Sequence, residues 1–369
     1  MAMGRQLSIE ENPDAGPMLT FLVLDRRVPA LTGTKPTVAT TLEEMGHRVV
    51  MAEDDARDLR QCDVLLMWNN PGYYPRTLRS LRALPKTHRP LVAAMYGEPL
   101  PAPRASGLPR WSGLNKAEIA KILLRDWRRT DIYSNARTLR SLMEGDIIDE
   151  LFVLGGEQEE YAAEQGYRAH RYDYGYHPNF GDLMGLERDI DVLFIGETRQ
   201  RRRRKLLQRL GDAGIDVTVR GSWHKTEGAL WGEERTRVLN RTKIVVHLQR
   251  YPGKVASKRF VLAMANGAMV VSEPSYRPDP FIDGTHYVSA TIDEMPRVIR
   301  HYLEHGEERE RITAVAHPFV TQQLTWRKTM EGVVAAIEAS PRINIFSATR
   351  EGGQRPHDPL GGRQLPSIE

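Results

Sequence analysis

The chain has 369 residues, 40% of them hydrophobic and 27% charged, which is typical of a folded protein of two domains and excludes a wholly disordered one. Its single cysteine, Cys62, excludes an internal disulfide, and no apolar run reaches the roughly 20 residues needed to span a bilayer. The net charge of +4 gathers in arginine clusters, which favour an anionic ligand or an acidic partner.

Residues 1–17 carry no periodic pattern, and we expect a flexible terminus there. After them, apolar runs alternate with helical patterns. The predicted strands are 20–25, 48–52, 63–68, 90–96, 131–134 and 150–154. The predicted helices are 36–45, 74–84, 116–128 and 157–165. Such alternation is typical of a parallel sheet with helices on both faces, so residues 18–180 predict a Rossmann-like N-terminal domain.

The segment from Tyr172 to Phe180 is rich in aromatic residues and contains Gly and Pro, and it predicts a linker between domains. The alternation then starts again, so residues 181–339 predict a second doubly wound domain, followed by a flexible tail over 340–369. Its predicted strands are 191–195, 217–220, 243–248, 268–272 and 286–289. Its predicted helices are 205–213, 232–240, 257–265, 293–305, 307–316 and 326–339. Two such domains imply a ligand between them, at the carboxyl ends of the strands.

A phosphate-binding turn is predicted at Gly196, where a buried strand meets a helix that begins with the run Arg201 to Lys205. A helix N-terminus carries about half a positive charge, so arginines in the first turn are unfavourable unless an anion offsets them. Arg199, Arg203 and Arg204 cannot all point one way at helical spacing. We therefore expect one or two of them to contact a diphosphate.

A second cationic signature surrounds the helix predicted over 257–265, which Asn266-Gly267 closes. Lys254, Lys258 and Arg259 flank its start, where cations would neutralise a departing diphosphate. Trp223 and Tyr251 are candidates for stacking on a nucleobase, with packing as the alternative. His247 lies inside an apolar strand, which predicts a core histidine rather than a base.

The second half resembles a known family on several of these segments together. They are the Phe194-Ile195-Gly196 turn, Arg220-Gly221, Arg259-Phe260, the run from Ala263 to Val271, and 280–287. Over residues 185–335 the chain is similar to glycosyltransferases of the GT-B architecture, in the branch with spore-protein-like "glycosyl transferases group 1" C-terminal domains. The resemblance implies an α/β fold of two Rossmann-like doubly wound domains facing a cleft.

The same resemblance implies how the domains divide the work. The C-terminal domain would bind a nucleotide-diphosphate sugar, most commonly UDP- or GDP-linked, and the N-terminal domain would bind the acceptor. The implied donor site adds Gly221 and Phe260 to the cations above. One position departs from the family: many relatives have Glu before Ala263, where it binds ribose, and this chain has Leu262. The ribose is then held otherwise, or the donor differs, or activity is lost.

Candidate general bases follow strands of the N-terminal half or lie in the linker: Asp25, Glu98 and His177. Asp25 precedes Arg26 and Arg27, which would lower its pKa and its basicity. Glu98 lies in a turn facing the expected cleft, and turn capping is the alternative for both carboxylates. His177 is also placed to brace the linker. No Cys/His spacing or Asp-x-Asp motif suggests a metal site, so we expect no metal and no cofactor.

The sequence therefore predicts a cytoplasmic, metal-independent glycosyltransferase, hexosyl or pentosyl, with retaining and inverting chemistry both open. Its partners would be a nucleotide sugar and an unknown acceptor, which is a small molecule, a glycan or a nucleic acid. Two alternatives stay open. Leu262 suits a catalytically silent nucleotide-binding module, and the positive charge suits a DNA-associated glycosyltransferase or binder.

Overall fold

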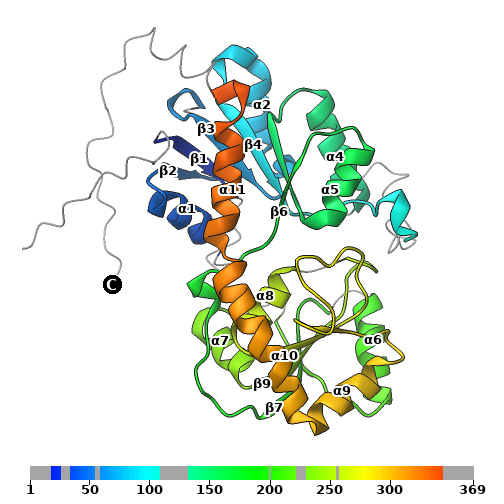
Figure 1. The fold of residues 1–369 in the computed structure, drawn as a ribbon. Helices are drawn as coiled ribbons and strands as arrows, with labels where there is room; N and C mark the ends of the chain where they lie inside the picture. Colours follow the sequence, from blue (N-terminus) through cyan, green and yellow to red (C-terminus); the bar gives the residue numbers. More distant parts are fainter. Residues whose placement is uncertain are drawn as a thin grey trace, which may run out of the picture.

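A computed structural model shows two α/β domains, one above the other in Figure 1. The structure describes residues 18–25, 34–54, 59–108, 132–198, 201–221, 230–254 and 257–343. The two parallel-sheet domains confirm the predicted fold class. Within the described residues, no helix has the length and apolar character needed to cross a membrane.

The N-terminal domain is built on a parallel sheet with the strand order β2-β1-β3-β4-β5-β6. Its strands are β1 (Thr20–Leu24), β2 (Arg48–Ala52), β3 (Val64–Trp68), β4 (Leu91–Tyr96), β5 (Glu150–Leu154) and β6 (His170–Tyr172). Its helices are α1 (Thr34–Glu44), α2 (Pro75–Ala83), α4 (Ile132–Glu144) and α5 (Gly155–Glu164). Short 3-10 turns are η1 (Leu59–Gln61), η2 (Pro71–Tyr73), η3 (Lys86–His88) and η4 (Arg104–Ser106). Strands β3 and β4 are buried along their whole length, as expected for the centre of a sheet with helices on both faces.

The C-terminal domain repeats this plan with the strand order β11-β10-β9-β7-β8. Its strands are β7 (Ile190–Ile195), β8 (Thr218–Arg220), β9 (Thr242–His247), β10 (Met269–Ser272) and β11 (Val288–Ser289). Its helices are α6 (Arg201–Asp212), α7 (Gly232–Asn240), α8 (Ser257–Ala265), α9 (Met295–Glu304) and α10 (Gly306–Pro318). The strand order reverses between β7 and β9, and between β1 and β3 in the other domain. Ligands of open α/β sheets bind at such switch points.

Two N-terminal segments differ from the sequence prediction. The strand predicted over 131–134 is wrong, because residues from Ile132 onward form α4. Ile132, Ala136 and Leu139 are buried at helical spacing, and this longer period overrides the short apolar run. The edge strand β6 was not anticipated, since its sequence His-Arg-Tyr is polar. The helix predicted over 116–128 lies outside the described residues.

The chain crosses between the domains twice, and the two crossings lie against each other. The first is the segment around Tyr174 and the turn η5 (Pro178–Phe180), and the second follows α10 through the π-helix η6 (Phe319–Gln323). The Tyr176 N–H donates to the Leu324 carbonyl at 2.7 Å. A Cβ atom on Gly175 would lie 2.4 Å from the backbone of residue 325, so this close approach requires glycine.

After the second crossing, α11 (Trp326–Glu338) packs on the N-terminal domain, against α1, β5 and β6 (Figure 1). The range 181–339 predicted for the C-terminal domain therefore ends in a helix that covers the other domain. Trp326 anchors this helix, with its ring centroid 5.5 Å from Trp68 of β3 and 5.3 Å from Tyr174 of the linker. One hydrophobic core consequently runs from the N-terminal sheet through the linker into α8.

Candidate donor site at the β7 switch point

Gly196 follows β7 at the point where the C-terminal strand order reverses. Its N–H donates to the carbonyl of Arg220 at 3.1 Å, which ties the turn to the end of β8. A Cβ atom at Gly196 would lie 2.9 Å from Nη2 of Arg259 and 3.6 Å from Nη1 of Arg203. The turn predicted from sequence therefore brings together a strand end, the first turn of α6 and the first turn of α8.

The guanidinium groups of Arg203 and Arg259 share one aromatic neighbour. They lie 5.7 and 5.6 Å from the ring centroid of Phe194, inside cation–π distance. Arg203 donates to the backbone carbonyls of Leu248, at 3.0 Å, and Glu197, at 3.3 Å. These contacts fix the positions of the cations, and among the described residues neither guanidinium forms an ion pair, although the charges of Glu197 and Glu273 act on Arg203.

Burial, followed by the charges of Arg250 and Arg202, lowers the pKa of Arg203 to about 10. Burial and then the charge of Arg203 lower the pKa of Arg259 to about 9. Within the described part of the chain, no carboxylate lies at ion-pair distance from Arg259. An anion placed between these two cations would restore their ordinary pKa and stabilise the turn.

His247, at the end of β9, is the hydrogen-bond partner of Arg259. Nη1 of Arg259 lies 2.5 Å from Nδ1 of the ring. Because an arginine only donates, Nδ1 accepts, and the neutral ring carries its proton on Nε2. Burial, followed by the charges of Arg259 and Arg203, holds the pKa of His247 well below 6.5. The ring is fully buried, which confirms the core histidine predicted from the apolar strand.

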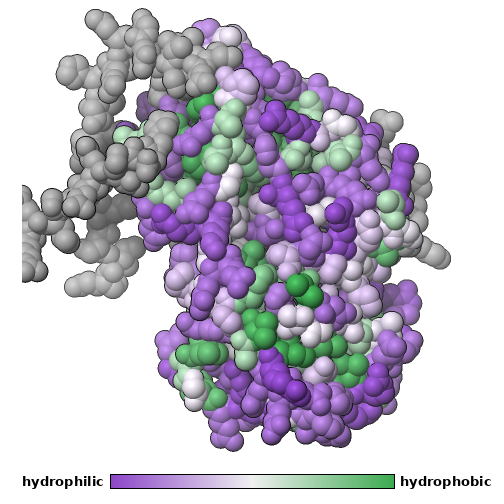
Figure 2. Space-filling model, in the orientation of Figure 1, coloured by the Kyte–Doolittle hydropathy of each residue, from purple (hydrophilic) through white to green (hydrophobic). Residues whose placement is uncertain are grey.

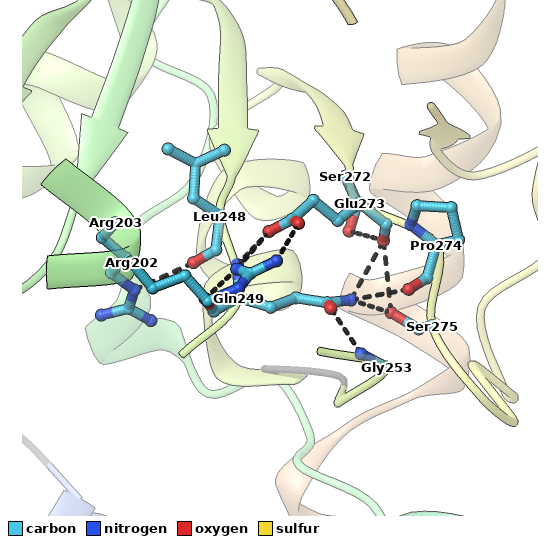
Figure 3. Close-up of polar contacts among 9 residues, drawn as sticks. All are labelled: Arg202, Arg203, Leu248, Gln249, Gly253, Ser272, Glu273, Pro274 and Ser275. Carbon is cyan, nitrogen blue, oxygen red and sulfur yellow. Dashed lines mark hydrogen bonds and ion pairs between the residues drawn. The ribbon is translucent and has the colours of Figure 1, made fainter. Parts of the chain in front are cut away.

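A polar brace fixes the loop beyond β9 and β10 (Figure 3). Nη1 of Arg202 donates to Oε2 of Glu273 at 2.9 Å and to the Gln249 carbonyl at 2.6 Å, and Nη2 of Arg202 also contacts the Glu273 carboxylate. The Gln249 amide nitrogen donates to the Ser275 hydroxyl at 2.9 Å, and its side-chain oxygen accepts from the Gly253 N–H at 2.6 Å. The Glu273 carboxylate is thus held by protein groups of this brace and needs no ribose contact to fix it.

Several predicted donor residues lie beside this turn in supporting positions. Gly221 backs Gly196, since a Cβ atom there would lie 3.3 Å from Ile195 and 3.7 Å from the Gly196 nitrogen. Phe260 is fully buried, with its ring centroid 5.3 Å from His247. Tyr251 is buried beneath Arg250, whose guanidinium carbon lies 5.0 Å from the Tyr251 ring centroid.

The remaining residues predicted for the donor site lie in different parts of the structure. Arg204 is exposed on α6. Arg199 and Trp223 lie outside the described residues. Lys254 forms an ion pair with Glu157 of the N-terminal domain. Leu262, which stands where relatives have the ribose glutamate, packs partly buried against the hydrophobic core.

Lys258 faces the N-terminal domain from the first turn of α8. Its ammonium lies 5.5 Å from the ring centroid of Tyr174 and 6.0 Å from that of Phe180. Burial and then Arg235 lower its pKa to about 8, while the negative charge of Asp25 acts in the opposite direction. The structure therefore brings a predicted donor cation and a predicted base together across the domain boundary.

On the N-terminal side, Glu98 follows β4 and lies half-buried among polar groups. Its Oε1 accepts from the Tyr73 hydroxyl at 2.9 Å, and its backbone carbonyl accepts from the Gln158 amide at 3.1 Å. Its charge raises the pKa of the buried Tyr172 and Tyr96 hydroxyls, after burial itself. The carboxylate is thus held at the strand ends that open toward the C-terminal domain.

His177 has a structural partner in the linker. Its Nδ1 accepts from the Asn179 N–H at 3.1 Å, and the side chain thereby caps η5. Burial lowers the pKa of the ring, with Glu44 opposing. This is the bracing position that the sequence offered as the alternative to a catalytic base.

Sequence reasoning missed Arg202, Gln249, Glu157 and Arg235 as contributors to this region. Arg202 was hidden in a run of identical residues, where only the helical phase separates a buried contact from a solvated one. Gln249 and Glu157 carried no local signal, because each acts through a partner far along the chain. Among the described residues, no group of three or more His, Cys, Asp or Glu could hold a metal ion.

Comparison with known proteins gives a family match over part of the chain. Residues 199–335 match the family model described as glycosyl transferase-like. No curated protein sequence matches the chain.

Solved structures of glycosyltransferases share the fold. Anabaena Alr3699/HepE in complex with UDP-glucose has a TM-score of 0.59 at 11% identity, covering 87% of this chain and 100% of that one. An alpha-glucosyltransferase in complex with UDP and a 13-mer DNA has a TM-score of 0.56 at 11% identity, with the same coverage. TarM of S. aureus has a TM-score of 0.52 at 12% identity, over 77% of this chain and 54% of that one. The GT-B fold is thereby confirmed, and the predicted enzyme class, glycosyltransferase, agrees with the family match over residues 199–335.

Proposed function

We propose that the enzyme transfers a sugar from a nucleotide-diphosphate donor, UDP- or GDP-linked, to an acceptor hydroxyl. The observation that carries the proposal is the pair at Gly196, the buried Arg203 and the half-buried Arg259, whose charges are made costly by desolvation and by neighbouring cations. A diphosphate would relieve both costs. It would also lie at the N-terminus of α6, where free N–H groups and the helix dipole favour an anion. Two of the structural neighbours are complexes with UDP or UDP-glucose.

In this proposal the arginines also do the work that a divalent metal does in other transferases. The charge that develops on the leaving diphosphate is met by preorganised cations, which is an effective form of transition-state stabilisation. We therefore infer a metal-independent reaction without a cofactor. Adding EDTA to a turnover assay tests this directly, and loss of activity that Mg²⁺ or Mn²⁺ restores would reject it.

The proposed acceptor base is Glu98, because its carboxylate is held by Tyr73 at the strand end while one side of the residue stays accessible. Asp25 is a weaker candidate, since the nearby Lys258 cation favours its ionised form and so lowers its basicity. The base would take the proton of the acceptor hydroxyl as that oxygen attacks the anomeric carbon.

Thermal shift with UDP, GDP, ADP and dTDP tests the donor site, because a ligand that binds only the folded state raises the melting temperature. No shift with any of the four would reject the proposal. Release of free nucleotide from the matching sugar donor then separates an enzyme from a silent binding module. A protein that binds nucleotide but never releases it from a sugar donor, with any acceptor tried, would favour the silent module.

A second acceptor class, DNA, is favoured by the exposed side of α2. Arg76, Arg79 and Arg82 recur there every third residue, and the helix carries no acidic residue. One neighbour of the same fold is a complex with DNA. Replacing the three arginines by glutamine should weaken binding to a DNA duplex and lower the slope of log affinity against log salt by about three, without changing UDP affinity. Duplex affinity that does not respond to salt would reject this acceptor.

A further inference from the structure

Across the domain boundary, α5 and β6 meet the loops of the C-terminal domain through charged side chains. Oε2 of Glu160 accepts from Arg277 at 3.0 Å and from the Tyr276 hydroxyl at 3.1 Å. Nη2 of Arg171 donates to the Asp279 carbonyl at 2.8 Å. These contacts are partly exposed, and Figure 2 shows mostly hydrophilic residues where the domains meet below α5. This side of the boundary is therefore polar, in contrast to the hydrophobic core that joins the domains at the linker.

One ion pair at this boundary differs from the rest because it is buried. The Lys254 ammonium contacts the Glu157 carboxylate, and their side chains are only 13% and 9% exposed. Burial raises the pKa of Glu157 and lowers that of Lys254, while each partner opposes the effect on the other. Both groups thus depend on a counter-charge, and either would seek another if its partner were lost.

Lys254 also lies next to the proposed diphosphate site. It belongs to the loop between β9 and α8, and its backbone lies beside the His247 ring, where it raises the pKa of that ring. His247 in turn contacts Arg259 at 2.5 Å. The His247 ring therefore lies between the Lys254 backbone and Arg259, one of the cations at Gly196. The flexible side chain of Lys254 is held by Glu157 of the N-terminal domain.

Resting on the proposed function, we infer that Glu157 is a positioning residue that competes with the donor diphosphate for Lys254. Without donor, Glu157 holds the ammonium on the N-terminal side. When the diphosphate binds, the ammonium turns toward it and the Glu157 contact is released. Donor binding is thereby linked to the boundary between the domains, because the contact that it breaks joins α5 to the C-terminal domain.

A double-mutant cycle measured by isothermal titration with UDP, and with GDP in parallel, tests this competition. Glu157→Gln frees Lys254 and should tighten nucleotide binding about tenfold. Lys254→Met should weaken it about tenfold, and the double variant should match Lys254→Met, since Glu157 acts only through the lysine. Uridine, which lacks phosphates, should bind all variants alike. Glu160→Gln is the matched control: it breaks a neighbouring boundary contact without touching Lys254, and should leave UDP affinity unchanged.

The double variant removes both buried charges together, so it still tests the lysine if a single variant fails to fold: a double variant that binds UDP as tightly as the wild type would overturn the inference. Glu157→Asp, which keeps the charge, should restore wild-type affinity. Wild-type protein that binds nucleotide together with a Glu157→Gln variant of equal affinity would overturn the competition while leaving the proposed function intact. Wild-type protein that binds neither UDP nor GDP would overturn both.

Discussion

Replacing Arg259 with methionine removes one guanidinium from Gly196 and leaves an unbranched apolar side chain beside Phe194. The pKa of Arg259 lies at about 9 rather than 12.5, so the folded chain holds this charge at a cost on the order of 5 kcal/mol, since each tenfold change in acidity corresponds to about 1.4 kcal/mol. The variant loses that cost but leaves Nδ1 of His247 without its donor, which costs about 1–3 kcal/mol. Without nucleotide, the variant should be at least as stable as the wild type.

With nucleotide bound, we expect the wild type to be more stable than the Arg259→Met variant. A charge-assisted hydrogen bond to the diphosphate contributes about 1.5–3 kcal/mol, so its loss should raise the Kd of UDP about 100-fold. At a UDP concentration of 100 times the wild-type Kd, the wild type gains about 2.7 kcal/mol and the variant about 0.4 kcal/mol. For a chain of this size, 1 kcal/mol corresponds to roughly 2 °C, so melting temperatures should rise by about 5 °C and 1 °C respectively.

Differential scanning fluorimetry with a UDP series measures both effects in one experiment. Arg209→Met serves as the control, because Arg209 is an exposed cation of α6 that pairs with Asp293 on the surface. A variant that keeps the full nucleotide shift would show that Arg259 does not contact the diphosphate. A variant that melts far below the wild type without nucleotide would show that the buried charge is a structural requirement instead.

Three further predictions follow from the site. Glu98→Gln should keep nucleotide affinity and lower turnover by about 100-fold or more, whereas Asp25→Asn should be milder; near-normal turnover in Glu98→Gln would remove it as the base. Turnover should persist in EDTA, measured as nucleotide release, because cations replace a metal at the leaving group. Lys258 has a folded pKa of about 8 and an unfolded value of 10.5, so the cost of its buried charge is present below pH 8 and disappears as the pH rises to 10.5. Denaturant titrations should therefore show the wild type gaining on the order of 2 kcal/mol relative to Lys258→Met between pH 7 and pH 10; parallel curves would contradict the burial of this charge.

Local patterns were enough to predict the strand–helix turn at Gly196 and the cations beside it. Gly196 and Arg203 lie within one strand–helix junction, and Arg259 begins the next helix but one, so chain order and a parallel sheet place all three at one edge. The same reasoning located most helices and strands within a few residues. It failed over 131–134, where the four residues Asp-Ile-Tyr-Ser are too few for their pattern to separate a strand from the start of a helix.

Contacts between distant segments could not be predicted. Lys254 and Glu157 are 97 residues apart, and Arg202 and Glu273 are 71 apart, with no periodic pattern linking either pair. Lys254 looked like a phosphate ligand from its position before a helix, and only the folded chain shows the carboxylate that occupies it. The first pairing depends on how the two domains meet and the second on how distant loops of one domain meet, and hydrophobic periodicity encodes neither.

The return of α11 to the N-terminal domain has a consequence for how the chain is made. Synthesis proceeds from the N-terminus, and early domains generally fold first. Here the surface of Trp68 and Tyr174 that receives Trp326 stays open until residues up to 338 have left the ribosome, long after the rest of the N-terminal domain has emerged. Of the two domains, the N-terminal one is thus synthesised first and completed last. Cleavage of the chain between the domains would leave it with an uncovered aromatic surface.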